Sequence, residues 1–296
     1  MRVGDAILDL ALATGAPSLF FVGVGKNVGK TVAMRAVYEA TVRASMTVGL
    51  ASIGRDGEAI DSGDGQPKPR LLLRPGAVIA TARSVLPQSP ASRILDLSTL
   101  VTAAGSLLYA RVVHDGYYEL VGPPTASGVR DAVTGLMRYA SYALVDGAVD
   151  RVAALAGGGD AIVVSVGADA ASTMDDAVAQ IRALVGRLRI AQYDPTVEHV
   201  RIEGALTPAM VSQLVAQRER RAILLRDPTQ LAMAGPAATY ALEHLNLRCE
   251  RPLRVVAVTV ASSGRERAFE PREFARAVAA ATGLPTFDVY AGAVAA

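Results

Sequence analysis

The sequence predicts an α/β fold in which a mostly parallel sheet is flanked by helices. Short aliphatic or β-branched runs alternate with longer stretches of 3.6-residue hydrophobic periodicity, a pattern typical of parallel strands joined by crossover helices. Runs such as Ala161–Val166 are continuously apolar, which indicates strands covered on both faces. The chain has 296 residues, of which 51% are hydrophobic, and can therefore bury a sizeable core.

The expected strands are short and end at turns rich in small residues. They cover Leu19–Val24, Thr47–Ile53, Tyr142–Val145, Ala161–Val166, Val197–Ile202, Arg221–Leu225, Leu253–Val260 and Pro285–Val289. The expected helices cover Thr31–Ser45, Gly128–Tyr139, Thr173–Leu188, Thr207–Arg218, Gly235–Leu245 and Pro271–Thr282. Two helix starts carry specific signals: Ser172 with Asp175 has capping-box spacing, and Thr207-Pro208 places proline at the first helical position.

Residues 54–122 interrupt this alternation. Their first part is rich in glycine and acidic residues and predicts a loop. Further on, the apolar runs Leu107–Val113 and Tyr117–Val121 flank His114–Gly116, which predicts a β-hairpin. We therefore expect a single domain over residues 1–296 with a hairpin-containing insertion or subdomain at about 54–122, placed at the end of the sheet where ligands bind.

Composition excludes several classes of protein. With 30 basic and 28 acidic residues the net charge is only +2, which argues against a dedicated nucleic-acid binder. The single cysteine, Cys249, excludes a disulfide framework and a zinc site built on cysteine pairs. No long apolar run is free of charge or of Gly and Pro, and Asp5 and Asp9 do not suit a secretory signal. We expect a cytoplasmic protein without a membrane partner, and the sequence leaves a homo-oligomer open.

A glycine-rich segment, Gly23–Thr31, follows the first expected strand and precedes a helix. Glycines let backbone N–H groups converge on phosphates, and a helix N-terminus adds partial positive charge. Lys30 would reach the β- and γ-phosphates, and the Thr31 hydroxyl would coordinate Mg²⁺. The predicted cofactor-binding residues are Gly25, Lys26, Asn27, Val28, Gly29, Lys30 and Thr31.

The glycine spacing of this segment argues against phosphate binding, whereas its lysine content argues for it. The usual pattern has glycine six positions before the lysine, where this chain has Val24, and glycine-rich strand-to-helix turns also occur without phosphate. However, 27 of the 30 basic residues are arginine, and two of the three lysines lie in this nine-residue segment. A compact ammonium fits among backbone amides better than a guanidinium, so the phosphate-binding interpretation is favoured.

A nucleoside triphosphate site also needs a carboxylate for the metal. Asp146 ends the expected strand Tyr142–Val145 and is the preferred catalytic and metal-holding candidate, although an aspartate at a strand end can simply cap a turn. Asp56 is the second candidate, for the metal or for positioning water. None of the three lysines lies in the Asn/Thr-Lys-x-Asp context that reads guanine, which favours ATP with Mg²⁺.

The spelling G-x-x-x-x-V-G-K-T resembles the dethiobiotin synthetase-like branch of P-loop NTPases, and Leu144–Ala148 resembles that branch's strand ending in acid-Gly-Ala. The resemblance covers about residues 18–53 and 142–289. It implies that Lys30 and Thr31 bind phosphate and Mg²⁺ and that Asp146 takes the acidic metal position. Dethiobiotin synthetases have a substrate-binding Lys-Pro where this chain has Ser52-Ile53, so biotin synthesis is disfavoured.

Other segments resemble the small P-loop subunit, often called KamB, that is associated with reactivating B12-dependent lysine 5,6-aminomutase. They are Ala51–Glu58, Ala80–Arg83, Asp115–Pro123 and Val145–Arg151. This resemblance implies a protein that uses ATP to help exchange damaged cobalamin together with a MutS-like ATPase partner.

Three functions follow from these patterns. The first is a nucleotide-driven switch or chaperone that binds ATP and hydrolyses it slowly. The second is an ATP-dependent synthetase that activates a small carboxylate, and the third is a P-loop relic that binds no ATP. Because the substrate lysine and a recognisable acid/base pair are missing from the sequence, the switch is favoured. Asp115, His199, His244 and Asp227 are expected to have structural roles.

Overall fold

A computed structural model describes residues 2–54, 70–87, 91–147, 155, 159–290 and 294–295. The chain divides into two compact units. Unit 1 comprises Met1–Val22 and Lys30–Ala154, and unit 2 comprises Gly23–Gly29 and Leu155–Ala296. Each unit has its own strands, helices and buried apolar residues.

Six strands form the main sheet of unit 1. They are β1 (Ser18–Gly23), β2 (Val48–Ser52), β4 (Val78–Ala82), β5 (Ser92–Thr102), β6 (Gly105–Val112) and β8 (Tyr142–Asp146). Their order is β1-β8-β2-β4-β6-β5. The first four in this order pair in parallel, and β6 and β5 continue the sheet in antiparallel pairing. All residues of β1 and β4 are buried, which explains their continuously apolar or small sequences.

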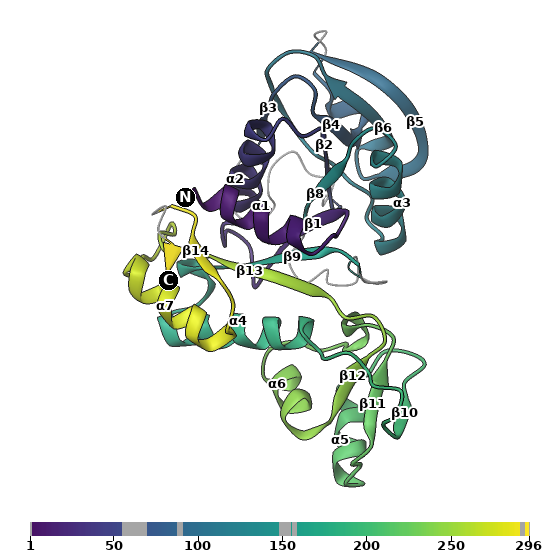
Figure 1. Ribbon diagram of the computed structural model, residues 1–296, viewed down its shortest axis with the longest axis vertical. Coiled ribbons are helices and arrows are strands. Elements are labelled where there is room, and N and C mark those ends of the chain that lie inside the picture. The colour runs from purple at the N-terminus through teal and green to yellow at the C-terminus, as the bar shows by residue number, and fades with distance from the viewer. Residues whose placement is uncertain are drawn as a thin grey trace. The chain divides into compact units, whose positions relative to one another are not determined.

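Unit 1 has three α-helices among its described residues. They are α1 (Val3–Ala13), α2 (Lys30–Arg43) and α3 (Ala126–Leu136). α1 packs along α2, and α3 packs against β2 and β4, so that α2 and α3 lie on opposite sides of the strands (Figure 1). Gly4 permits the close contact of α1 with α2, because a Cβ there would lie 1.9 Å from the carbonyl oxygen of Ala36.

The predicted hairpin across His114–Gly116 is wrong. β6 pairs with β4 and β5, whereas the chain after this turn forms β7 (Gly116–Tyr118), which pairs with β3 (Leu71–Leu73). The hairpin of this region instead joins β5 to β6 through Ala103 and Ala104. This turn is held by the side chain of Thr102 and by Gly105 at φ +106°, and its two alanines carry no turn signal.

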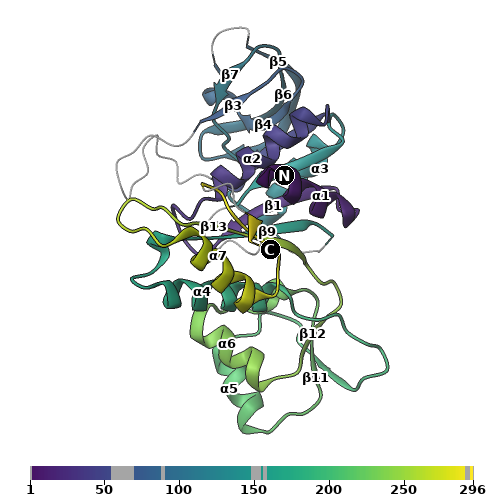
Figure 2. The ribbon, with the colours of Figure 1, turned by 60° about the vertical axis from the view of Figure 1, so that its left-hand side comes forward.

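The main sheet of unit 2 contains β9 (Ala161–Gly167), β13 (Arg254–Ala261), β14 (Thr286–Asp288) and β15 (Val294–Ala295). β9, β13 and β14 are parallel, and β15 is antiparallel to β14. The helices α4 (Met174–Leu188) and α7 (Pro271–Thr282) pack against each other and lie side by side in both ribbon views (Figures 1 and 2). β9 is buried along its whole length, as its apolar sequence predicts.

A second, three-stranded parallel sheet of unit 2 contains β10 (His199–Arg201), β11 (Ala222–Leu225) and β12 (Leu247–Cys249). The helices α5 (Pro208–Ala216) and α6 (Gly235–His244) lie beside it (Figure 2). Its buried side chains form a separate cluster: Ile190, Ile202, Leu206, Val211, Ile223, Leu225, Leu231, Met233, Ala238, Ala241, Leu245, Leu247 and Cys249.

The predicted α/β class with a mostly parallel sheet flanked by helices is confirmed, and each predicted strand and helix is present within a few residues of its expected bounds. Thr207 caps α5 and Pro208 begins it, as predicted. α4 is capped one residue later than predicted, because Thr173 rather than Ser172 accepts the N–H, from Asp176 at 3.1 Å. A single domain with an insertion at 54–122 stays a prediction.

Candidate phosphate-binding site

The predicted phosphate loop spans the division between the units along the chain. Gly23–Gly29 belongs to unit 2, whereas Lys30 and Thr31 begin α2 in unit 1. The two segments are joined by the Gly29–Lys30 peptide bond. A strand directly before the loop and a 14-residue helix directly after it are the context in which a glycine-rich loop binds phosphate.

Strand ends of unit 2 fix the backbone of Gly23–Gly29. The N–H of Val24 donates to the carbonyl oxygen of Ser165 in β9 at 3.1 Å, and Val28 is 1% exposed. Gly167, the last residue of β9, lies so close that a Cβ there would approach the Val28 Cα to 2.9 Å. The loop therefore packs tightly against the carboxyl end of a parallel strand, which is where α/β folds bind ligands.

Gly29 and Asn27 give the loop its unusual backbone. Gly29 has φ +87°, and a Cβ there would lie 3.0 Å from the Ala261 Cβ and 3.3 Å from the Val289 Cγ2. Asn27 has φ +55°, in the left-handed region that asparagine tolerates. The side chains of Lys26 and Asn27 are exposed, and Gly25 and Lys30 are partly buried. Glycine at position 29 is thus required by both conformation and space.

Thr31 and Asp146 meet within unit 1. The Thr31 hydroxyl donates to Asp146 Oδ2 at 3.1 Å, and β8 ends at Asp146. This pairing brings together the two oxygen ligands that the sequence assigns to Mg²⁺, at the first turn of α2. Hard oxygen ligands of this kind suit Mg²⁺, which in such sites takes its remaining ligands from phosphate and water.

Opposing effects act on the pKa of Asp146. Burial raises the pKa of its carboxyl above the usual range, and the charge of Lys30 and the hydrogen bond from Thr31 oppose that rise. Burial therefore makes the charged carboxylate costly unless further positive charge lies nearby. A divalent cation would supply that charge, and the site fits the predicted metal in this respect.

The backbone around Asp146 explains the glycine that follows it. The Ile53 N–H donates to the carbonyl oxygen of Asp146 at 2.9 Å, and the Gly147 N–H donates to that of Phe21 at 2.8 Å. A Cβ at Gly147 would lie 2.2 Å from this Phe21 oxygen, so no larger residue fits. The acid-Gly turn is required by the close approach of two strand ends.

Asp56, the second predicted carboxylate, lies outside the described residues, as does Lys68. In the part of the chain that the structure describes, no group of three or more His, Cys, Asp or Glu side chains could hold a metal ion. None of the described helices is long and apolar enough to cross a membrane.

The other polar positions singled out in the sequence have local partners. Asp115 forms an ion pair with Arg74, and the Asp227 carboxylate caps a short 3-10 helix (Pro228–Gln230). His244 stacks on Tyr240. Cys249 is fully buried and donates to the carbonyl oxygen of Ile190, so it is placed as a core residue.

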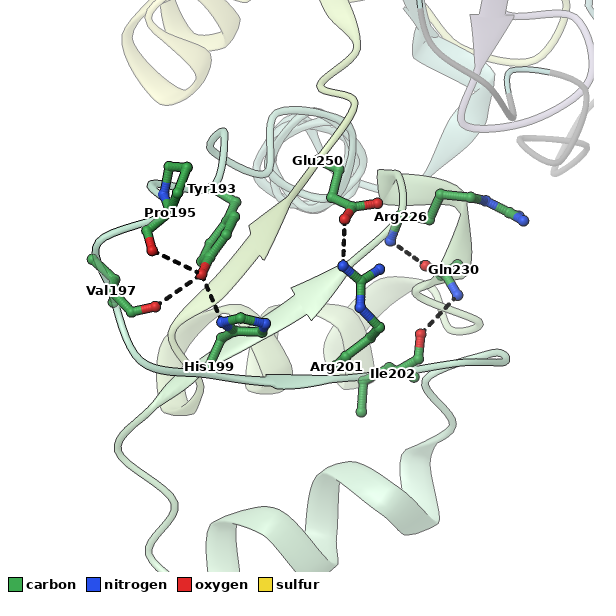
Figure 3. A network of polar contacts seen from close by, with 9 residues as sticks. All are labelled: Tyr193, Pro195, Val197, His199, Arg201, Ile202, Arg226, Gln230 and Glu250. Carbon is green, nitrogen blue, oxygen red and sulfur yellow. Dashed lines mark hydrogen bonds and ion pairs between the residues drawn. The ribbon is translucent and has the colours of Figure 1, made fainter.

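Figure 3 shows the polar contacts at the edges of the three-stranded sheet. The Tyr193 hydroxyl lies 2.6 Å from His199 Nδ1 and also donates to the carbonyl oxygen of Val197, while Arg201 binds Glu250 at 2.5 Å (Figure 3). These contacts join segments of one sheet to each other, which is consistent with the structural role predicted for His199.

Asp169 is a further polar residue, which the sequence patterns do not single out, and it lies two residues beyond β9 in a short 3-10 helix (Ala168–Ala170). Its carboxylate accepts hydrogen bonds from three successive backbone N–H groups of the loop after β13, those of Arg265, Glu266 and Arg267. An acidic residue just beyond a buried strand was the available signal, the same signal that singled out Asp146. The partner loop is almost a hundred residues away, and no local pattern indicates it.

Comparison of the chain with protein families, with curated proteins and with solved structures finds no match.

Proposed function

We propose that the chain binds ATP with Mg²⁺ through Gly23–Thr31 and acts as a nucleotide-driven switch. The observation that carries this proposal is the 3.1 Å hydrogen bond from Thr31 to Asp146, directly after Lys30 at the start of α2. A hydroxyl, a carboxylate and an ammonium at a helix N-terminus are the groups that a metal-bound triphosphate requires. The tight packing of Val28 and Gly29 supports a loop held ready for phosphate.

Each residue has a role in this proposal. Backbone N–H groups of Gly25–Gly29 would bind the phosphates, and the Lys30 ammonium would neutralise the β- and γ-phosphates. Thr31 would coordinate Mg²⁺ directly, and Asp146 would hold its water shell. The bound metal would offset charge that develops on the phosphate oxygens during transfer.

The proposed reaction is slow hydrolysis of ATP. A water oxygen bonds to the γ-phosphorus, the bond from that phosphorus to the β–γ bridging oxygen breaks, and the products are ADP, inorganic phosphate and a proton. Asp56 remains the proposed residue for positioning this water. Binding and hydrolysis would switch the conformation of a client-binding segment, as in other nucleotide switches.

The proposed client is a B12-dependent aminomutase, with a MutS-like ATPase as partner and the cytoplasm as the location. This part rests on the resemblance of several segments to the KamB subunit. Two of these segments are structurally defined in unit 1, since Ala80–Ala82 lies in the buried strand β4 and Gly122 packs against the end of β2.

The synthetase alternative requires a group to hold an activated small carboxylate. At the position of the substrate lysine stand Ser52, which ends β2, and Ile53, which is 4% exposed, and neither side chain carries an ammonium. This observation favours the switch over the synthetase.

ATP turnover of the wild-type protein and of Asp146→Asn, with and without the aminomutase and the MutS-like subunit, tests the proposal. Asp131→Asn is the matched control, because Asp131 is an exposed aspartate of α3 in the same unit. We expect slow turnover that the partners accelerate, at least about tenfold lower in Asp146→Asn and unchanged in Asp131→Asn. A small molecule that stimulates turnover stoichiometrically and yields a new covalent product would overturn the switch in favour of a synthetase.

A further inference from the structure

A tight loop after β13 is wrapped around the carboxylate of Asp169. Ser263 and Ala268 form an antiparallel bridge, the Gly264 N–H donates to the carbonyl oxygen of Arg267 at 2.8 Å, and the Phe269 N–H donates to that of Ser262 at 2.8 Å. The loop Gly264–Arg267 is therefore a closed turn with its own backbone hydrogen bonds. Its residues Arg265, Glu266 and Arg267 are exposed.

Asp169 fills the inside of this turn. Its carboxylate accepts from the N–H groups of Arg265 at 2.6 Å, Glu266 at 3.2 Å and Arg267 at 3.0 Å. A Cβ on Gly264 would lie 2.2 Å from Asp169 Oδ1, so only glycine allows this approach. Burial acts to raise the pKa of Asp169, but these three N–H groups lower it overall. Successive backbone N–H groups that converge on one carboxylate form an anion-binding nest, with Asp169 as its built-in ligand.

The two strands that lead into this arrangement, β9 and β13, end against the candidate phosphate loop within unit 2. Asp169 follows Gly167 by two residues, and Gly167 packs against Val28 with no room for a methyl group. On the other side, Ala261 precedes Gly264 by three residues and contacts Gly29. A shift of the phosphate loop would therefore displace the two segments that hold the nest together.

We infer that Asp169 is a positioning residue that couples occupancy of Gly23–Gly29 to the conformation of the surface loop Gly264–Arg267. This inference rests on the proposed nucleotide binding and deepens it, because it names the surface that changes with nucleotide. When phosphate binds to the packed loop Gly23–Gly29 and shifts it, the ends of β9 and β13 move with it, and the three hydrogen bonds to Asp169 change together. Packed segments of this kind switch between discrete arrangements. A small shift of the phosphate loop can therefore change the conformation of the surface loop Gly264–Arg267.

Limited trypsin digestion reads this coupling directly, because trypsin cleaves after Arg265 and Arg267. The samples are the full chain with and without ATP and Mg²⁺, as wild type, Asp169→Asn and the control Asp175→Asn. Asp175 is an exposed aspartate in the first turn of α4 in the same unit, outside the nest. Calorimetry with ATP and Mg²⁺ on each protein establishes separately whether nucleotide binds.

Without nucleotide, we expect Asp169→Asn to raise the cleavage rate at Arg265 and Arg267 at least about fivefold, because the asparagine amide turns an N–H group toward the donors of the nest. Asp175→Asn should stay within about twofold of wild type. ATP should change the cleavage rate at these two sites at least about threefold in the wild type and in Asp175→Asn. In Asp169→Asn, ATP should still bind but should leave the cleavage rate at these sites unchanged.

Two results would overturn the coupling while leaving nucleotide binding intact. One is wild-type protein that binds ATP by calorimetry but shows unchanged cleavage at Arg265 and Arg267. The other is Asp169→Asn that keeps the full nucleotide effect. Wild-type protein that binds no ATP would instead refute the proposed function and the coupling with it. The wild-type comparison needs no variant, so it decides the matter even if Asp169→Asn does not fold.

Discussion

Gly167→Ala probes the packing of the phosphate loop on β9. The added Cβ would lie 2.9 Å from the Val28 Cα and 3.3 Å from the Asn27 carbonyl oxygen. Because carbon atoms pack at about 3.5–4.0 Å, the loop must move by roughly 0.6–1 Å. Gly167 itself has extended φ and ψ of −127° and 163°, so alanine causes no backbone strain there.

The cost of this substitution can be worked from two terms. Overpacking of this size destabilises the folded state by about 1–3 kcal/mol. Replacing glycine by alanine at a compatible φ and ψ stabilises it by about 0.4–1 kcal/mol, because the unfolded chain has less conformational entropy. With the mid-range values of about 2 and 0.7 kcal/mol, we expect the free energy of unfolding to fall by about 1.3 kcal/mol. We also expect the affinity for ATP and Mg²⁺ to fall at least about tenfold, because a displaced loop misdirects several N–H groups at once.

Urea unfolding and calorimetry on the purified variants measure both effects. Gly204→Ala is the matched control, because a Cβ at the exposed Gly204 meets no atom within 4 Å. If Gly167→Ala had the same ATP affinity and the same unfolding midpoint as Gly204→Ala, the packing argument would be refuted.

Two further substitutions and the reactivity of one thiol test separate parts of the structure. Thr31→Val removes the hydroxyl that bonds Asp146 and should weaken Mg²⁺-dependent ATP binding at least about tenfold in calorimetry, with little change in Mg²⁺-free binding; equal loss in both conditions would contradict a metal role. Gly122→Ala places a Cβ 1.6 Å from the Ser52 carbonyl oxygen and should cost at least about 3 kcal/mol in urea unfolding, and a near-neutral result would contradict this contact. Burial raises the pKa of Cys249 to about 12, so the thiol of the folded protein should not react with a disulfide reagent at pH 8, and rapid reaction would contradict its placement in the core.

The raised pKa of Cys249 also predicts a pH dependence of stability. Between about pH 9 and 12 the unfolded thiol ionises while the folded thiol stays protonated, so the folded state binds more protons and stability falls as pH rises. The slope due to this one group is at most about 1.4 kcal/mol per pH unit. Cys249→Ala should lack this part of the slope in urea unfolding above pH 9, and identical slopes would contradict it.

The strands and most helices could be predicted because their signals are local. β9 is a continuous apolar run, and α7 keeps the bounds Pro271–Thr282 that its periodicity predicts. α1 is not among the predicted helices, although Val3, Ile7 and Ala11 repeat every four residues on its buried face. β4 lies in the segment that broke the alternation, and its parallel pairing with β2 depends on residues far apart in the chain.

The prediction that is wrong, and the contact that was not predicted, both depend on residues far apart in the sequence. His114–Gly116 has the composition of a hairpin turn, but the next strand pairs with Leu71–Leu73 instead. The start of α2 at Lys30 and the end of β8 at Asp146 agree with the sequence, because a helix start and a strand end have local signals. The contact of Asp169 with Arg265–Arg267 has no such signal, because it depends on how two distant loops fold against each other.

The most direct test of the central claim is calorimetric titration of ATP with Mg²⁺ into the wild-type protein, Lys30→Ala and Arg35→Ala. Arg35 is an exposed cation on the same helix, α2, and controls for loss of positive charge. We expect saturable binding to the wild type and to Arg35→Ala, and a loss of at least about a hundredfold in affinity for Lys30→Ala, because one charge-assisted phosphate contact is removed. Equal affinities in Lys30→Ala and the wild type, or no binding to the wild type, would contradict the assignment of Gly23–Thr31 as a phosphate loop.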